Sequence, residues 1–127
     1  MKEIMAVIRM NKINQTKQAL SLAGFPSVTC CKVLGRGKKK VDYQLIGKLL
    51  DGAEIESPKV AEAVSEGHRL LPKRLLMMMV KDEDVGEVVK IIIETNQTKN
   101  AGDGKIFVMP VEETYRMRTG ETGDIVL

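Results

Sequence analysis

The sequence predicts an α+β domain in which a β-α-β unit occurs twice, giving four strands and two helices. Two observations lead to this prediction. Runs typical of strands flank a run typical of a helix near the N-terminus, and the same order returns in the second half of the chain. The chain has 127 residues, enough for one domain with its own hydrophobic core and too few for two large ones. We therefore expect residues 1–127 to form a single domain.

The first β-α-β unit begins at the N-terminus. Strands are expected at Glu3–Met10 and Ser27–Gly35, because both segments are rich in β-branched and apolar residues. Asn14 is expected to cap a helix that begins at Gln15, and Gly24 is placed to end that helix.

The second unit follows the same order. Strands are expected at Lys73–Lys81 and Lys105–Val111, with Pro110 marking an edge or the end of the last strand. Asp82 is a candidate cap for the helix between them. Two successive β-α-β units predict a ferredoxin-like sandwich, with four antiparallel strands and both helices on one face. Four residues form one apolar face of the second helix: Val85, Val88, Val89 and Ile92.

A connection of 37 residues, Arg36–Pro72, separates the two units. Connections of this length are commonly functional or mobile, and the alternative is a solvated insertion. The segment opens with four cations in five residues, RGKKK, and both YQLIGKLL and Pro58–Glu66 could form a short helix. Residues 112–127 are expected to form a C-terminal loop and tail.

Composition disfavours several classes of function. The formal net charge is only +3, and aromatic residues make up 3% of the chain with no Trp, which argues against a single-stranded nucleic-acid binder. The longest apolar stretches, such as Leu75–Val80, are too short to cross a bilayer. The first residues lack the pattern of a signal peptide, so a cytoplasmic location is expected.

Neither a catalytic group nor a metal site stands out. The one histidine, His68, has no identifiable partner, and one histidine with two adjacent cysteines does not give metal-ligand spacing. Cys30 and Cys31 would point to opposite faces of a strand, so an easy disulfide is not expected. Both are expected to be small hydrophobes on a buried strand. Met77–Met79 is expected to line the core and a pocket.

Residue types that bind anions are most concentrated in Thr98–Glu121. Gly102–Lys105 could turn sharply and present successive N–H groups to an anion, and Lys105 adds a positive charge. The alternative is an ordinary turn before a strand. Arg116 and Arg118 would project from one face of an extended segment, suited to a polyphosphate; the alternative is two surface arginines.

These motifs resemble the PII signal-transduction (nitrogen regulatory) protein family. The segment TKNAGDGKIFVMPV, Thr98–Val111, is similar to the family's glycine-loop motif, and RMRTGE, Arg116–Glu121, is similar to its C-terminal loop. The starting MKEIMAVIR, GRG at Gly35–Gly37 and LPK at Leu71–Lys73 also fit the family pattern. The likeness covers nearly the whole chain apart from the long connection.

The resemblance implies a trimer of ferredoxin-like subunits that binds ATP or ADP in clefts between neighbouring subunits. It also implies that the long connection is the family's T-loop, which contacts target proteins. Lys39, Lys40 and Lys73 are the implied residues for the effector 2-oxoglutarate. The implied nucleotide-binding residues are Thr29, Gly35, Gly37, Lys38, Gly102, Asp103, Gly104, Lys105, Arg116 and Arg118.

The chain departs from the family pattern in the long connection. A glutamine usually stands at the loop base and coordinates the magnesium that bridges ATP and 2-oxoglutarate, whereas Lys39 stands at about that position here. Lysine has donors only and cannot ligate a cation, so the role of magnesium is left open. The tyrosine motif for uridylylation is absent, since Tyr43 lies in VDYQL, and nucleotidylation is not expected. With the longer loop, these features resemble the nitrogenase-associated subgroup.

The resulting prediction is a regulator that is not an enzyme. We expect a homotrimer or a mixed ring with a sister PII subunit, with nitrogenase as the protein target and neither nucleic-acid binding nor membrane insertion. The alternatives are a PII protein that regulates another target, such as an ammonium transporter or a nitrogen-metabolism enzyme, and a nucleotide-using enzyme on the same fold. A third alternative is a module that binds nucleic acid or a membrane partner through RGKKK.

Overall fold

The structure is a computed structural model that describes residues 1–37 and 70–127. The chain divides into two units, residues 1–33 with 72–127 and residues 34–71. Both described α-helices and most of the sheet belong to the first unit. The elements in chain order are β1 (Lys2–Arg9), η1 (Met10–Lys12), α1 (Ile13–Leu22), β2 (Thr29–Gly35), β3 (Leu71–Val80), η2 (Asp82–Asp84), α4 (Val85–Asn96), β4 (Lys105–Pro110) and η3 (Asp124–Val126).

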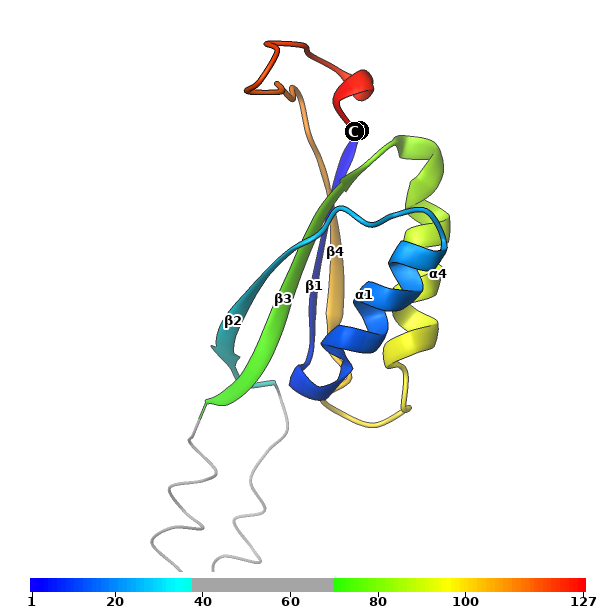
Figure 1. The fold of residues 1–127 in the computed structure, drawn as a ribbon. Helices are drawn as coiled ribbons and strands as arrows, with labels where there is room; N and C mark the ends of the chain where they lie inside the picture. Colours follow the sequence, from blue (N-terminus) through cyan, green and yellow to red (C-terminus); the bar gives the residue numbers. More distant parts are fainter. Residues whose placement is uncertain (38–69) are drawn as a thin grey trace, which may run out of the picture. The chain divides into compact units, whose positions relative to one another are not determined.

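The four described strands form one sheet in the order β2-β3-β1-β4. β1 lies between β3 and β4 and is antiparallel to both, with Met5 opposite Met77 on one side and Phe107 on the other. α1 and α4 cover the same face of the sheet (Figure 1). The predicted ferredoxin-like α+β class is therefore confirmed.

The core lies between the sheet and the two helices. Every second residue of β1 is buried from Ile4 onward, as expected for a strand with one face against helices. α4 contributes Val88 and Ile92 to the core, with Val85 and Val89 packed against it, so the predicted apolar face is confirmed. The buried core residues are Ile4, Ala6, Ile8, Leu20, Leu76, Met78, Val80, Val88 and Ile92.

Both expected helix caps are wrong. α1 begins at Ile13, so Asn14 lies inside the helix instead of before it. Asp82 starts a 3₁₀ turn, and its carboxylate lies 2.6 Å from the amino nitrogen of Met1 and 3.2 Å from Nζ of Lys2. In both places the chain enters the helix through a 3₁₀ turn, which supplies early hydrogen bonds that a capping side chain would otherwise provide.

Gly24 ends α1 as predicted. Its φ of +95° lies in the left-handed region that favours glycine. The Phe25 N–H donates to the Leu20 carbonyl at 2.8 Å, and the Gly24 N–H donates to the Ser21 carbonyl at 3.1 Å. This is the Schellman pair of hydrogen bonds, and Phe25 also packs against the core. The chain is thereby turned back toward the sheet.

A buried polar pair joins the two helices. The Asn96 side-chain nitrogen donates to the Thr16 hydroxyl at 3.0 Å and to the Ile92 carbonyl at 2.9 Å. The Thr16 hydroxyl in turn donates to the Lys12 carbonyl at 2.8 Å. Both side chains are buried, so these bonds offset the cost of removing polar groups from water.

The expectations for the sulfur-containing residues need correction. Cys30 and Cys31 are free thiols and both are exposed, because β2 is an edge strand whose residues are mostly uncovered. The expectation of buried cysteines is therefore wrong. The methionine run is split by the alternation of the strand, since Met78 is 4% exposed and Met79 is 41% exposed. The expectation of core residues holds for Met78 but not for Met79, and the expectation of a pocket is confirmed, because Met77, Met78 and Met79 all line one surface hollow.

Strand boundaries differ from the sequence prediction by one or two residues. β3 begins at Leu71, inside the expected connection Arg36–Pro72, and β2 begins at Thr29 rather than Ser27. The two short helices expected within the connection lie outside the described residues, as do Tyr43 and His68. Within residues 1–37 and 70–127, no helix has the length and apolar character needed to cross a membrane.

Candidate functional site

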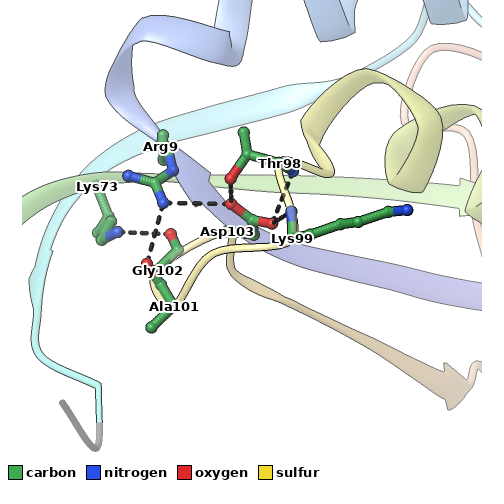
Figure 2. Close-up of polar contacts among 7 residues, drawn as sticks. All are labelled: Arg9, Lys73, Thr98, Lys99, Ala101, Gly102 and Asp103. Carbon is green, nitrogen blue, oxygen red and sulfur yellow. Dashed lines mark hydrogen bonds and ion pairs between the residues drawn. The ribbon is translucent and has the colours of Figure 1, made fainter.

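The loop between α4 and β4 contains the predicted glycine motif and is fastened by side chains (Figure 2). The Asp103 carboxylate turns back to accept hydrogen bonds from the backbone N–H groups of Thr98, at 2.8 Å, and Lys99, at 2.9 Å. It also accepts a hydrogen bond from the Thr98 hydroxyl. Arg9, the last residue of β1, donates to Asp103 at 3.2 Å and to the Ala101 carbonyl at 3.0 Å. The loop is thus closed on itself and tied to the sheet.

A second cation holds the same loop from the neighbouring strand. Nζ of Lys73 on β3 donates to the Gly102 carbonyl at 3.0 Å (Figure 2). Lys73 lies opposite Arg9 in the pairing of β1 with β3. The consecutive carbonyls of Ala101 and Gly102 are therefore held by two cations from paired strands. Lys73, expected as an effector residue, lies directly against the glycine motif.

The glycines of this motif are required by contacts within the chain. A Cβ on Gly104 would lie 1.9 Å from the Val7 carbonyl oxygen, and the residue has a φ of +113°. Gly102 has a φ of +97°, and a Cβ there would lie 3.3 Å from a guanidinium nitrogen of Arg9. The sequence alone suggested that the glycines admit a ligand. The structure shows that the absence of a Cβ at these positions lets the loop pack closely against β1 and against the Arg9 side chain.

The outer side of the loop offers hydrogen-bond donors. The backbone N–H groups of Gly102, Asp103 and Gly104 have no acceptor among the described residues. Consecutive unpaired N–H groups in a turn form a concavity that binds anions. Lys105 follows, exposed and without a carboxylate partner in the part of the chain that the structure describes. The turn therefore has the donors and the charge that a phosphate group requires.

The Asp103 carboxyl is held in its ionised form. Hydrogen bonds from the hydroxyl and backbone N–H of Thr98 lower the pKa of Asp103 to about 2, and the contacts with Arg9 and the Lys99 N–H act in the same direction. Both carboxylate oxygens already accept hydrogen bonds within the loop, so Asp103 acts as a brace rather than a free metal ligand. Elsewhere in residues 1–37 and 70–127, no group of three potential metal-ligating side chains occurs.

The C-terminal loop places its two arginines differently. The Gly120 N–H donates to the Arg116 carbonyl at 2.7 Å, so Arg116–Gly120 is a turn. The Arg116 guanidinium pairs with the Glu121 carboxylate and donates to the Ile125 carbonyl at 3.2 Å. Arg118 is exposed, and no ionic partner for it exists among the described residues. The premise that both arginines project from one face of an extended segment is wrong.

The glycine motif and the arginines lie at opposite ends of the sheet in one chain. Lys105, at the start of β4, pairs with Val7 near the end of β1. Pro110, at the end of β4, pairs with Lys2, and the chain runs on from there to Arg118 (Figure 1). The five residue steps of β4 separate these ends by about 17 Å at the usual strand rise. The structure therefore brings Lys73 to the glycine motif and leaves the arginines apart.

The other expected nucleotide and effector residues lie on or beyond β2. Thr29 is the first residue of β2 and is exposed, Gly35 is its last residue, and Gly37 follows two residues later. The remaining three, Lys38, Lys39 and Lys40, lie outside the described residues.

Sequence reasoning missed the side chains that shape the loop. Arg9 was visible only as a cation ending an apolar run, and Thr98 only as the first residue of the glycine motif. Lys99 has a positive φ of +65°, which nothing in the sequence indicated. A signal for Arg9 existed, because a cation at the end of a mostly buried strand must reach a partner or solvent.

Fold and site together define a class: a ferredoxin-like α+β domain with a braced glycine turn between α4 and β4. The chain matches the family described as nitrogen regulatory protein P-II over residues 1–121, and it belongs to that family. It is 44% identical over 130 residues to nitrogen fixation nifHD region GlnB-like protein 2 of Methanothermococcus thermolithotrophicus, with 100% of this chain and 98% of the relative covered. The resemblance found in the motifs is confirmed.

Two further relatives extend the comparison. The chain is 45% identical over 127 residues to nitrogen fixation nifHD1 region GlnB-like protein 2 of Methanosarcina barkeri, covering 100% of this chain and 99% of the relative. It is 37% identical over 130 residues to nitrogen regulatory protein P-II 2 of Methanothermobacter thermautotrophicus, covering 97% and 94%. The first two relatives carry names from the nitrogen-fixation region, in agreement with the subgroup to which the motifs pointed.

Proposed function

We propose that the protein is a non-enzymatic regulator that binds ATP or ADP between neighbouring copies of the chain. The observation that carries this proposal is the separation of the two cationic groups along β4. One chain cannot bring the glycine turn and Arg118 to the same phosphate chain, because about 17 Å of strand lies between them. A neighbouring copy can supply the second group.

The uncovered face of the sheet supports assembly of copies. Met5, Met77 and Phe107 lie side by side across three strands, and the alternating burial of β1 and β3 puts them on the face opposite the core. Phe107 is 48% exposed and Met79 is 41% exposed, so this apolar face is open in the single chain. Such a face suits burial against other copies. With membership of the P-II family, it supports a closed three-fold ring, formed by this chain alone or with a sister PII subunit.

The proposed roles follow from the placement of the donors. The N–H groups of Gly102–Gly104, together with Lys105, would bind phosphate oxygens, and Arg118 of a neighbouring copy would reach the same phosphates. Arg116 would mainly support the turn that presents Arg118, because Glu121 and Ile125 already occupy its guanidinium. Thr29, Gly35, Gly37 and Lys38 are proposed to line the nucleotide.

The effector site is proposed around Lys73. An incoming 2-oxoglutarate carboxylate would have to displace the Gly102 carbonyl from Nζ of Lys73. Lys39 and Lys40, outside the described residues, are the other proposed contacts. Effector and nucleotide would thus share the glycine turn, so binding of one can change the affinity for the other. Magnesium has no established ligand in this scheme.

Mixed assemblies test the nucleotide proposal. Lys105→Ala and Arg118→Ala should each weaken ATP binding by roughly 1–3 kcal/mol, the scale of a charged hydrogen bond, as measured by calorimetry. Lys90→Ala, which removes an exposed cation from α4, is the matched control and should leave ATP affinity unchanged. Refolding the two weak variants together should restore tight binding in part, because some neighbours then combine an intact turn with an intact Arg118.

Three results would contradict the proposal. Unchanged ATP affinity in both variants would show that neither Lys105 nor Arg118 contributes to ATP binding. Failure of the mixture to restore binding would place both residues in one subunit's site. Steady-state ATP turnover by the purified protein would favour the nucleotide-using enzyme instead.

We propose nitrogenase as the protein target and the long connection as the contacting segment. The support is the family membership and the nifHD-region names of the relatives. An ammonium transporter or another nitrogen-metabolism enzyme is the alternative target. Deleting Tyr43–Glu66, which lies outside the described residues, should abolish capture of nitrogenase in a pull-down while sparing ATP binding and assembly. Capture with a normal response to ATP, ADP and 2-oxoglutarate by the deleted form would refute this role.

A further inference from the structure

The two cysteines lie in a cationic hollow and directly follow Thr29, one of the residues proposed to line the nucleotide. Cys30 and Cys31 are free, exposed thiols on β2. Both line a surface hollow of about 430 Å³ that also contains residues of α1 and β3. Its charged lining residues are Lys17, Lys32 and Arg74, and no carboxylate lines it. The hollow is therefore a thiol site with a positive surround, which concentrates small anions.

The hollow lies away from the apolar face proposed to pack against other copies. Residues of η1 and α1 form one wall, so the hollow lies on the helix-covered side of the sheet. Copies that pack through Met5, Met77 and Phe107 would use the opposite face. Lys17 and Lys32 are exposed and have no carboxylate partner within the described residues, so their charge is available to a ligand.

We propose that the Cys30–Cys31 pair is a modification site that forms a mixed disulfide with small anionic disulfides. One cysteine thiolate attacks a sulfur of the disulfide, the original S–S bond breaks, and a new S–S bond joins the cysteine to half of the reagent. The other half leaves as a thiolate and takes a proton from water. The cysteine sulfur is oxidised and the leaving sulfur is reduced, so the reagent is itself the oxidant.

The second cysteine does not readily reverse the reaction. The Cα atoms of adjacent residues lie only about 3.8 Å apart, below the usual separation in a disulfide, so the neighbouring thiol is poorly placed to attack the new bond and form a disulfide within the pair. The modification therefore lasts until an external thiol removes it. The site adds a response to thiol redox state that the proposed nucleotide function does not include and does not require.

Competition between reagents of opposite charge tests the proposal. Reduced full-length protein is treated with glutathione disulfide, which is anionic, or cystamine, which is cationic, and addition is followed by intact mass. We expect added mass with glutathione disulfide in the wild type and none in Cys30→Ser/Cys31→Ser. In Lys17→Gln/Lys32→Gln, the ratio of the two rates, anionic over cationic, should fall about tenfold, the lower end of charge-steering effects.

A matched variant controls for net charge. Lys81→Gln/Lys90→Gln removes the same charge from exposed positions that do not line the hollow, and should leave the rate ratio at the wild-type value. If the wild type gains no mass, the proposed modification site is wrong. An equal fall of the ratio in both lysine variants overturns the role of the hollow. Because the readout is covalent mass and does not involve ATP, the result is independent of the nucleotide proposal.

Discussion

The glycine loop, Thr98–Lys105, and the C-terminal turn, Tyr115–Thr122, combine glycine with cations in two different ways. Four side-chain or backbone donors and a close approach to β1 fasten the first. The second is held mainly within itself, by an isolated bridge, an ion pair and hydrogen bonds among nearby residues, and its Arg118 is exposed. The difference teaches that one half of the proposed site is preformed, whereas the other half is positioned to adapt to a second chain.

The largest expected effect separates the glycines of the two regions. Gly104→Ala should lower the free energy of unfolding by at least about 3 kcal/mol and abolish ATP binding, because the added Cβ would meet the Val7 carbonyl at 1.9 Å at a positive φ. Gly120→Ala, the matched change in the other region, should cost only about 1–2 kcal/mol, since its φ is +75° but nothing lies within 4 Å.

Urea unfolding of both alanine variants measures this contrast. Equal losses would mean that the packing of Gly104 against β1 does not distinguish the two regions. A small loss at Gly104 would mean that the loop shifts away from β1 at little cost, and the description of the loop as preformed would then be wrong.

An intermediate effect comes from the carboxylate that braces the glycine loop. The pKa of Asp103 is about 2 in the fold, below the ordinary 3.8, so the folded state favours the ionised form. Its stabilisation is complete above about pH 4 and is lost as the pH falls toward 2. Asp103→Asn should therefore be less stable than the wild type at neutral pH, with the difference shrinking through this window. The variant should also bind ATP more weakly because the turn loses its brace.

Thermal unfolding of wild type and Asp103→Asn from pH 6 to pH 2 follows that difference. A constant difference across the range would show that ionised Asp103 does not stabilise the fold. Asp82 also titrates at low pH with a lowered pKa, owing to hydrogen bonds from the amino group of Met1 and from Lys2. Since Asp82 is present in both proteins, its effect cancels in the comparison.

The smallest expected effect belongs to the C-terminal turn. Glu121→Gln removes the ion pair with Arg116. The Arg116 side chain is 32% exposed and the Glu121 side chain is 44% exposed. Exposed pairs of this kind contribute about 0.5 kcal/mol, so the stability should change little. A loss well above that value in urea unfolding would show that this turn is also rigidly fastened, and the contrast between the regions would disappear.

Periodicity in the sequence was sufficient to predict the fold. Alternation along β1 and the helical spacing from Val85 to Ile92 each depend on a single element facing one core. The caps failed because a 3₁₀ turn stands at the entry to each helix. Asn14 follows η1 and lies inside α1, whereas Asp82 is the first residue of η2 and pairs with cations at the N-terminus. Local residue preferences do not contain that tertiary information.

The sequence was sufficient to predict the residue types of the candidate site, but only part of its geometry. The glycine motif was recognised, but the need for Gly104 comes from its register against Val7, which only the paired sheet defines. The arginine pair was misplaced because Gly120 and Glu121 convert an apparently extended segment into a turn. Exposure of the cysteines likewise depends on which strand lies at the edge of the sheet.

The length of β4 has a thermodynamic consequence. If the two ends of this strand must come from different copies to enclose one polyphosphate, the nucleotide acts as a linker between copies. Binding and assembly then become linked equilibria: added ATP favours association, and dilution of the protein lowers the apparent affinity for ATP. A titration performed on dilute protein would consequently report the extent of assembly as well as the strength of the phosphate contacts.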